Sequence, residues 1–96
     1  MYIISLHFLA PVEKVNEHRV EHLELLKDYF AVGKAVAWGR KQNPENGGIV
    51  LCDNMNRAEV NAFIEKDPYH KYNLAEYEVI EVAFSTAAER LEGLLG

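Results

Sequence analysis

Residues 34–53 read KAVAWGRKQNPENGGIVLCD, and this stretch decides the order of strands and helices. Its two ends, 34–41 and 48–53, are rich in Val, Ile and Trp and have the character of strands. Four residues that favour turns lie between them: Asn43, Pro44, Asn46 and Gly47. The stretch therefore predicts a β-hairpin with a rather long loop, in which Gly47 and Gly48 serve the turn.

A strand and a long helix are expected before the hairpin. Residues 2–9 alternate with the period of a strand. One face carries Tyr2, Ile4, Leu6 and Phe8, and the other carries Ile3, Ser5, His7 and Leu9. After Pro11 a helical stripe recurs at Val15, Arg19, His22, Leu26 and Phe30. Gly33 supplies the left-handed residue that ends a helix, so we expect one continuous helix over residues 12–32.

A second helix and a fourth strand are expected after the hairpin. Asn56 is suited to cap a helix, and Glu59, three positions later, completes a capping box. The buried stripe of this helix is Val60, Phe63 and Ile64. Pro68 prevents its continuation. Residues 76–84, EYEVIEVAF, alternate again and predict the last strand.

The C-terminal residues predict one further helix. Ser85 or Thr86 can cap the segment AAERLEGLL, whose apolar positions include Ala88 and Leu91. A helix this short is not stable unless it docks, and a partner subunit is one possible docking surface. We therefore divide a single domain of residues 1–96 into a core, 1–84, and a C-terminal helical extension, 85–96.

The element order is β-α-β-β-α-β, which predicts an α+β domain of ferredoxin-like type. The right-handed crossover rule places both main helices on one face of a four-stranded antiparallel sheet. The other face, which carries Ile3 and Leu9, would then be an exposed apolar patch. We therefore expect a homodimer in which a second copy covers that face.

Composition narrows the classes of partner. The chain has 96 residues and a net charge of −5, and its ten Lys and Arg residues form no basic stripe, which disfavours nucleic acid. Cys52 is the only cysteine and cannot form an internal disulfide, which fits a reducing compartment. The first residues lack the basic segment of a signal peptide, and no apolar run reaches membrane-spanning length. We expect a cytoplasmic protein without a membrane or nucleic-acid partner.

His22 and Asp67 are the candidates for chemistry. His22 lies in the apolar stripe of its helix, where an imidazole must be hydrogen-bonded or border a pocket. Asp67 continues the stripe of Phe63, at a helix end where the macrodipole disfavours a carboxylate. Each also has a structural interpretation: His22 satisfied by a carbonyl or water, and Asp67 a turn former before Pro68. As partners they would form a His/Asp pair.

Other kinds of site lack part of the residue pattern that they require. His18 and His22 are four residues apart and could share a metal ion, but no third ligand is visible, so we predict neither a metal nor a cofactor. No phosphate-binding glycine motif and no Ser-His-Asp pattern is present. Four aromatic residues could line a pocket or belong to the core: Trp38, Tyr69, Tyr72 and Tyr77.

Three motifs resemble the YCII-related family: His22 with Leu26, GKAVAWGRKQNPENGGIVL at 33–51, and DPYHKYNLAEYEVIEV at 67–82. The resemblance implies a dimeric α+β barrel, similar to muconolactone isomerases, with a His/Asp dyad in a pocket. The dyad falls on His22 and Asp67. Where the family pattern leads us to expect a basic residue after Pro44, this chain has Glu45, which argues against an anion contact in that loop.

Two functions follow from these residues. The first is an acid–base enzyme, an isomerase, lyase or dehalogenase acting on a small organic acid or lactone, in which His22 and Asp67 are catalytic. The second is a dimeric ligand-binding or accessory module in which the pair only fixes the two helices. For either, the expected ligand contacts are Ser5, His7, Arg19, Gly39, Arg40 and Tyr69.

Overall fold

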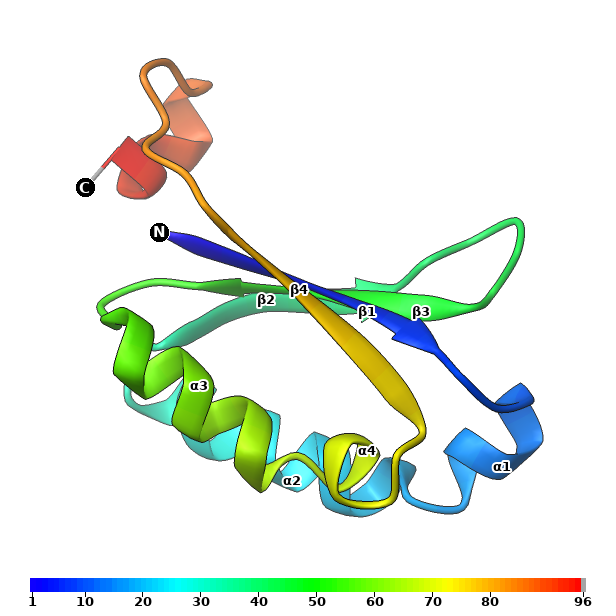
Figure 1. Ribbon diagram of the computed structural model, residues 1–96. Helices are drawn as coiled ribbons and strands as arrows, with labels where there is room; N and C mark the ends of the chain where they lie inside the picture. Colours follow the sequence, from blue (N-terminus) through cyan, green and yellow to red (C-terminus); the bar gives the residue numbers. More distant parts are fainter. Residues whose placement is uncertain (96) are drawn as a thin grey trace.

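Strand β1 (Tyr2–Phe8) lies inside a four-stranded sheet in the computed structural model, which describes residues 1–95 (Figure 1). The other elements are α1 (Val12–Asn16), α2 (Arg19–Ala31), β2 (Ala35–Arg40), β3 (Gly47–Cys52), α3 (Arg57–Lys66), α4 (Pro68–Lys71), β4 (Ala75–Glu81) and the 3₁₀ helix η1 (Glu89–Leu95). The sheet order is β2-β3-β1-β4, and all pairs are antiparallel. The predicted ferredoxin-like α+β fold is confirmed.

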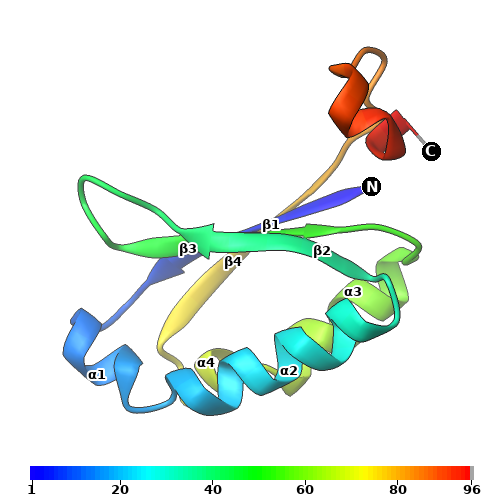
Figure 2. The ribbon, with the colours of Figure 1, turned by 180° about the vertical axis from the view of Figure 1, so that it is seen from behind.

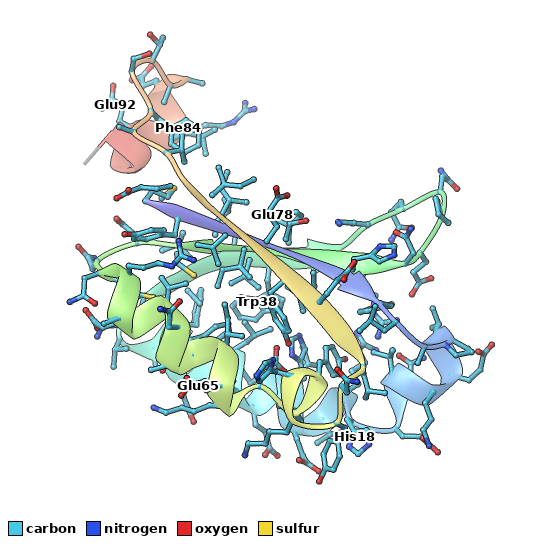
Figure 3. The ribbon with its side chains drawn as sticks, viewed as in Figure 1. His18, Trp38, Glu65, Glu78, Phe84 and Glu92 are labelled. Atoms are coloured by element: carbon cyan, nitrogen blue, oxygen red, sulfur yellow. The ribbon has the colours of Figure 1, made fainter. Side chains whose placement is uncertain are left out.

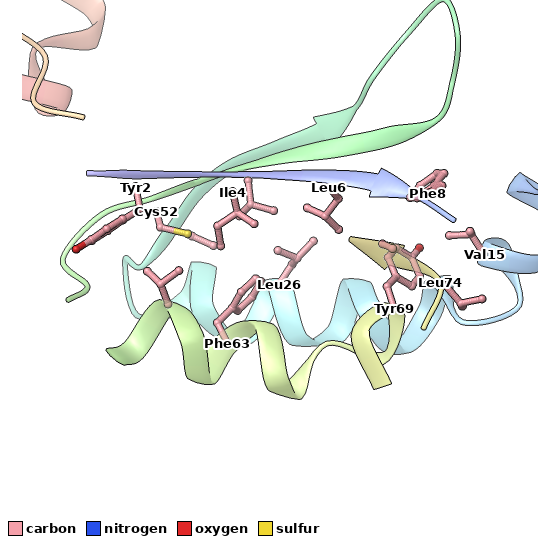
Figure 4. Packing of buried hydrophobic residues seen from close by; sticks show 14 residues of the cluster. Tyr2, Ile4, Leu6, Phe8, Val15, Leu26, Cys52, Phe63, Tyr69 and Leu74 are labelled. Atoms are coloured by element: carbon pink, nitrogen blue, oxygen red, sulfur yellow. The ribbon is translucent and has the colours of Figure 1, made fainter. Parts of the chain in front are cut away.

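The alternation of β1 divides the molecule into a core side and an open side. Tyr2, Ile4, Leu6 and Phe8 are buried. Helices α2 and α3 lie side by side under that face, and within residues 1–95 no helix covers the opposite one (Figures 1 and 2). Leu26 of α2 and Phe63 of α3 reach up toward β1 and complete the core, as Figure 4 shows. Each of these two helices thereby buries its apolar face against the sheet.

The predicted helix over residues 12–32 is wrong, because the chain breaks between α1 and α2. His18 has non-helical dihedral angles, φ −114° and ψ 12°. The turn at Glu17 and His18 lets Val15 be fully buried at one end of the sheet while α2 runs underneath it (Figure 1). Three consecutive polar residues, Asn16 to His18, offer no apolar surface that would hold a straight helix against the core.

The second helix begins as predicted. The Asn56 side chain accepts from the backbone N–H of Glu59 at 2.8 Å, and Glu59 accepts in return from the Asn56 N–H at 3.2 Å. Pro68 ends α3 as expected, but it also occupies the first position of a short helix, α4, that was not anticipated. Proline suits that position because it has no N–H to satisfy there.

The chain after β4 also departs from expectation. The last strand was expected to reach residue 84 but ends at Glu81, because Glu81 already pairs with Tyr2 and the Val82 N–H bonds to the carbonyl of Met1, where the partner strand begins. The last helix is 3₁₀ rather than α, with a kink at Leu91, which is 45% exposed. The segment is short and, in Figure 1, stands away from the sheet, so little packing supports an α-helix. The side chains of residues 94 and 95 lie outside the described part.

The two hairpin glycines lie at the start of β3 rather than in the turn. A Cβ on Gly47 would stand 2.0 Å from the carbonyl oxygen of Leu6, and one on Gly48 would stand 3.1 Å from that of Gly39. Both are distances at which a neighbour must move. These glycines therefore allow close contact of β1, β2 and β3 beneath the pocket described below.

Candidate functional site

The fold brings His22 and Asp67, 45 residues apart in sequence, into direct contact. His22 lies on α2, and its Nδ1 is 2.9 Å from Asp67 Oδ1. Asp67 lies at the junction of α3 and α4 and is completely buried, while His22 is 9% exposed. The negative charge of Asp67 is unfavourable at the C-terminal end of α3, but the same residue caps the N-terminus of α4, where a carboxylate is favourable.

The Asp67 carboxylate accepts hydrogen bonds from three donors, the first of which is His22 Nδ1. Its Oδ1 also accepts from the backbone N–H of Tyr69 at 3.1 Å, and its Oδ2 accepts from the Tyr77 hydroxyl at 2.8 Å. Burial, followed by the negative charge of Asp67, raises the pKa of the Tyr77 phenol, so Tyr77 stays a neutral donor. Asp67 is therefore held as a fully bonded acceptor in the protein interior.

This arrangement fixes the orientation of His22. A carboxylate only accepts hydrogen bonds, so the hydrogen between the two side chains belongs to Nδ1. The ring also stacks on Tyr69, with centroids 4.0 Å apart and an interplanar angle of 13°. Nε2 has no protein hydrogen-bond partner among the residues that the structure describes. It is the atom left free for chemistry.

A pocket of about 210 Å³ opens beside His22, between α2 and the core side of the sheet. Its polar groups come from four elements: Arg19 and His22 from α2, Arg40 from β2, Tyr69 from α4, and the backbone of Gly47 and Gly48 from β3. Apolar walls come from Leu6, Phe8, Leu23, Leu26, Trp38 and Val50. Figure 3 shows Trp38 between the sheet and the helices, whereas Glu78 projects from the open face.

Arg40 is anchored on several sides. Its Nη1 donates to Glu45 Oε1 at 2.7 Å, its Nη2 donates to Asn16 Oδ1, and the guanidinium lies 5.5 Å from the centre of the Phe8 ring. Burial lowers its pKa, but the bonds to Glu45 and to the Tyr69 phenol outweigh that effect, so the pKa is raised. Arg40 therefore remains a cation at one side of the pocket.

Tyr69 contributes a neutral hydroxyl to the same space. Burial raises the pKa of its phenol, Asp67 adds to the rise, and the positive charges of Arg40 and Arg19 oppose it. The net direction is upward, so the hydroxyl keeps its hydrogen at neutral pH. The pocket thus combines an imidazole nitrogen, a phenol and two guanidinium groups around apolar walls.

Comparison with known proteins identifies the family. The model of the YCII-related domain matches residues 1–83. The chain belongs to the YCII-related family. No curated protein matches this chain. A solved structure with the same fold is a 5-chloro-2-hydroxyhydroquinone dehydrochlorinase from Burkholderia phenoliruptrix AC1100, in complex with 2,5-dihydroxybenzoquinone; it has a TM-score of 0.68 and 19% identity, over 85% of this chain and 93% of that one.

In this YCII-related chain the pocket gathers most of the predicted ligand contacts. Arg19, Gly39, Arg40 and Tyr69 all line it with His22, and Asp67 lies directly behind. Ser5 and His7 are not brought to it, because alternate residues of β1 face opposite sides and theirs face the open side. In a dimer formed through the open faces, these two residues would lie between the two sheets and apart from this pocket.

Several contacts were not anticipated from the sequence. Tyr77 was one of four aromatic candidates for a pocket, but it lies behind Asp67 as a hydrogen-bond donor. Tyr72 is 56% exposed and stacks on His18, with ring centroids 4.2 Å apart. The bond from Arg40 to Glu45 joins residues only five apart, but it was not predicted because it depends on the conformation of the hairpin loop between them.

Within residues 1–95 no three His, Cys, Asp or Glu side chains gather as metal ligands would. His18 and His22 are engaged separately, one with Tyr72 and the other with Asp67. Over the same residues, none of the helices combines the length and the apolar character that crossing a bilayer requires.

Proposed function

We propose that this YCII-related domain is an acid–base enzyme in which His22 Nε2 transfers a proton to or from a small organic substrate. The observation that carries the proposal is the 2.9 Å bond from His22 Nδ1 to the buried Asp67, which leaves Nε2 as the unbound nitrogen of a residue that lines the pocket. Asp67 is a positioning residue, since it touches His22 and not the pocket. It would also stabilise the imidazolium formed when Nε2 accepts a proton.

The proposed chemistry begins at a carbon next to a carbonyl. Nε2 removes a proton from that carbon, and the electron pair of the C–H bond passes to the carbonyl oxygen to form an enolate. Returning the proton to another carbon isomerises the substrate, whereas loss of a neighbouring leaving group as its anion completes an elimination. Tyr69 can donate a hydrogen bond to the enolate oxygen, because its phenol is neutral.

Pocket size favours a small substrate. A volume of about 210 Å³ is of the order of the ~150 Å³ engineered cavities that hold one benzene molecule. The dehydrochlorinase of similar fold was solved with 2,5-dihydroxybenzoquinone, which also has a single ring. We therefore propose a small organic acid or lactone as substrate, and isomerase, lyase or dehalogenase reactions as the classes to test.

The test is proton exchange. Wild type is incubated in D₂O with a panel of small lactones, enolisable ring acids and their halogenated analogues, and mass spectrometry follows deuterium uptake and halide loss. Exchange or turnover should be present in wild type and lost in His22→Gln. If ligands shift the melting temperature of both proteins equally and no exchange occurs in either, the domain is a binding module instead.

We also propose a homodimer formed through the open sheet face. Leu51, Ile3 and Ile80 lie next to one another across β3, β1 and β4, and Ile80 is 42% exposed. The same face of a second copy can pack against this apolar row, so that each copy buries the row of the other. Sedimentation velocity should give a dimer for wild type and a monomer for Ile3→Glu; a monomeric wild type would refute this.

The free, buried Cys52 supports a reducing compartment such as the cytoplasm.

A further inference from the structure

We infer that the pocket selects ligands with a single negative charge, bound by Arg19, and that Glu45 sets this limit by neutralising Arg40. The inference concerns the ligand class of the pocket in the proposed function, and it rests on that pocket but not on proton transfer by His22. Three groups of observations support it: the state of Arg19, the state of Arg40, and the other charges nearby.

Arg19 is the cation available to a ligand. It lines the pocket one helical turn before His22. No carboxylate forms an ion pair with it among residues 1–95. Tyr69 lines the same pocket, and the positive charge of Arg19 is one of the effects that lower the pKa of its phenol. A planar guanidinium without a partner is suited to bind a carboxylate or enolate oxygen pair.

Arg40 lines the same pocket, but its charge is already balanced. The ion pair with Glu45 occupies Nη1, and Asn16 occupies Nη2. The Arg40 side chain is 20% exposed and that of Glu45 is 47% exposed, so the pair lies where the hairpin loop meets solvent at the pocket edge. A second anionic group on the ligand would have to compete with Glu45 for Arg40.

Asp67 adds to the same effect. Its carboxylate is fully buried behind His22 and contributes a second negative charge close to the pocket. Two guanidinium groups therefore line the pocket and two carboxylates lie close to it, and within residues 1–95 Arg19 is the guanidinium that has no ion pair. One negative charge on the ligand is matched by Arg19, whereas a second meets Glu45 and Asp67 without a free cation.

The experiment compares ligands of equal shape and different charge. Terephthalate carries two carboxylates, and 4-carbamoylbenzoate replaces one of them by an amide of similar size; the pair isophthalate and 3-carbamoylbenzoate gives a second geometry. Dissociation constants are measured by calorimetry for wild type, Glu45→Gln, Glu45→Lys and Arg19→Gln. Glu65→Gln on the outer surface of α3 is the matched control for loss of one negative charge (Figure 3).

Wild type should bind the monoanion of a pair more tightly than the dianion. Glu45→Gln should improve dianion binding by about tenfold with little change for the monoanion, Glu45→Lys should improve it further, and Arg19→Gln should weaken the monoanion by about tenfold. Glu65→Gln should behave as wild type. The inference is overturned if Glu45→Gln and Glu65→Gln change the ratio equally, or if no monoanion of the set binds wild type.

Binding of these probes is independent of turnover, so the two proposals can fail separately. His22→Gln should keep the preference for monoanions, because it leaves Arg19, Arg40 and Glu45 in place. If the charge preference follows Glu45 while no proton exchange is found for any substrate, the acid–base function is wrong and the ligand class stands. If exchange depends on His22 but charge preference ignores Glu45, the reverse holds.

Discussion

The hydroxyl of Tyr77 donates a 2.8 Å hydrogen bond to Oδ2 of Asp67, which has no exposed surface. The two residues approach from different directions, Tyr77 from the strand β4 and Asp67 from the junction of α3 and α4. Tyr77 therefore links the sheet to the dyad, and it supplies the only hydrogen bond that the structure gives to Oδ2 within residues 1–95. Loss of that donor leaves a buried carboxylate oxygen unpaired.

Tyr77→Phe should lower the free energy of unfolding by about 1–3 kcal/mol, the range for a buried acceptor left without its donor. Urea unfolding would show a lower midpoint with an unchanged slope. Tyr72→Phe is the control, because Tyr72 is mostly exposed and its contact with His18 is made by the ring. Equal midpoints for the two variants would argue against the role given to Tyr77.

Asp67→Asn should change the tautomer of His22 without removing the side-chain volume. In wild type, ¹⁵N chemical shifts of the imidazole should show hydrogen on Nδ1 and none on Nε2 at a pH where His22 is neutral. An asparagine can present either oxygen or nitrogen to the ring, so the variant should show a mixed or reversed tautomer. Turnover, where found, should fall by about 10²–10⁴-fold. An unchanged spectrum would contradict the positioning role.

Gly47→Ala should destabilise the fold far more than Gly39→Ala. A Cβ at Gly47 meets the Leu6 carbonyl at 2.0 Å, whereas a Cβ at Gly39 has no neighbour within 4 Å. Separating β3 from β1 to make room should cost about 3 kcal/mol, the upper end of the usual range for overpacked sites. Gly39→Ala should be neutral or slightly stabilising. Thermal unfolding of both variants checks this, and similar melting temperatures would refute it.

Stability should fall above pH 9, partly because of Cys52. Burial raises the pKa of this thiol to about 11, from an ordinary value of 9.0. Between these values the unfolded chain loses a proton that the folded protein keeps, so the free energy of unfolding decreases as pH rises, by at most about 1.4 kcal/mol per pH unit. Below pH 9 the thiol is protonated in both the folded and the unfolded state, so Cys52 causes no loss of stability there.

The measurement is a set of urea unfolding curves between pH 8 and 10.5 for wild type and Cys52→Ala. All other titratable groups are the same in the two proteins, so their contribution cancels in the difference. Wild type should lose more stability over this range than the variant. Parallel pH profiles for the two proteins would show that the Cys52 thiol does not titrate in the manner proposed.

Much of the fold could be predicted because its signals are local. Alternation along residues 2–9 fixed which side chains of β1 share a face, and the spacing of Asn56 and Glu59 fixed the start of α3, since a capping box involves only residues three apart. The position of His22 on the core stripe of α2 follows in the same way. Local sequence therefore determined the four strands, the two main helices, their order and the candidate residues His22 and Asp67, but not the break before α2, the short helix α4 or the 3₁₀ form of η1.

Tertiary structure decided what those residues contact. The break at His18 depends on the burial of Val15 at the end of the sheet, and the end of β4 depends on where β1 begins. The 2.9 Å bond between His22 and Asp67 joins positions 45 residues apart, whose separation is set by the packing of two helices against one sheet. Contacts of this range carry no local pattern, because their energies arise only when distant segments have already packed together.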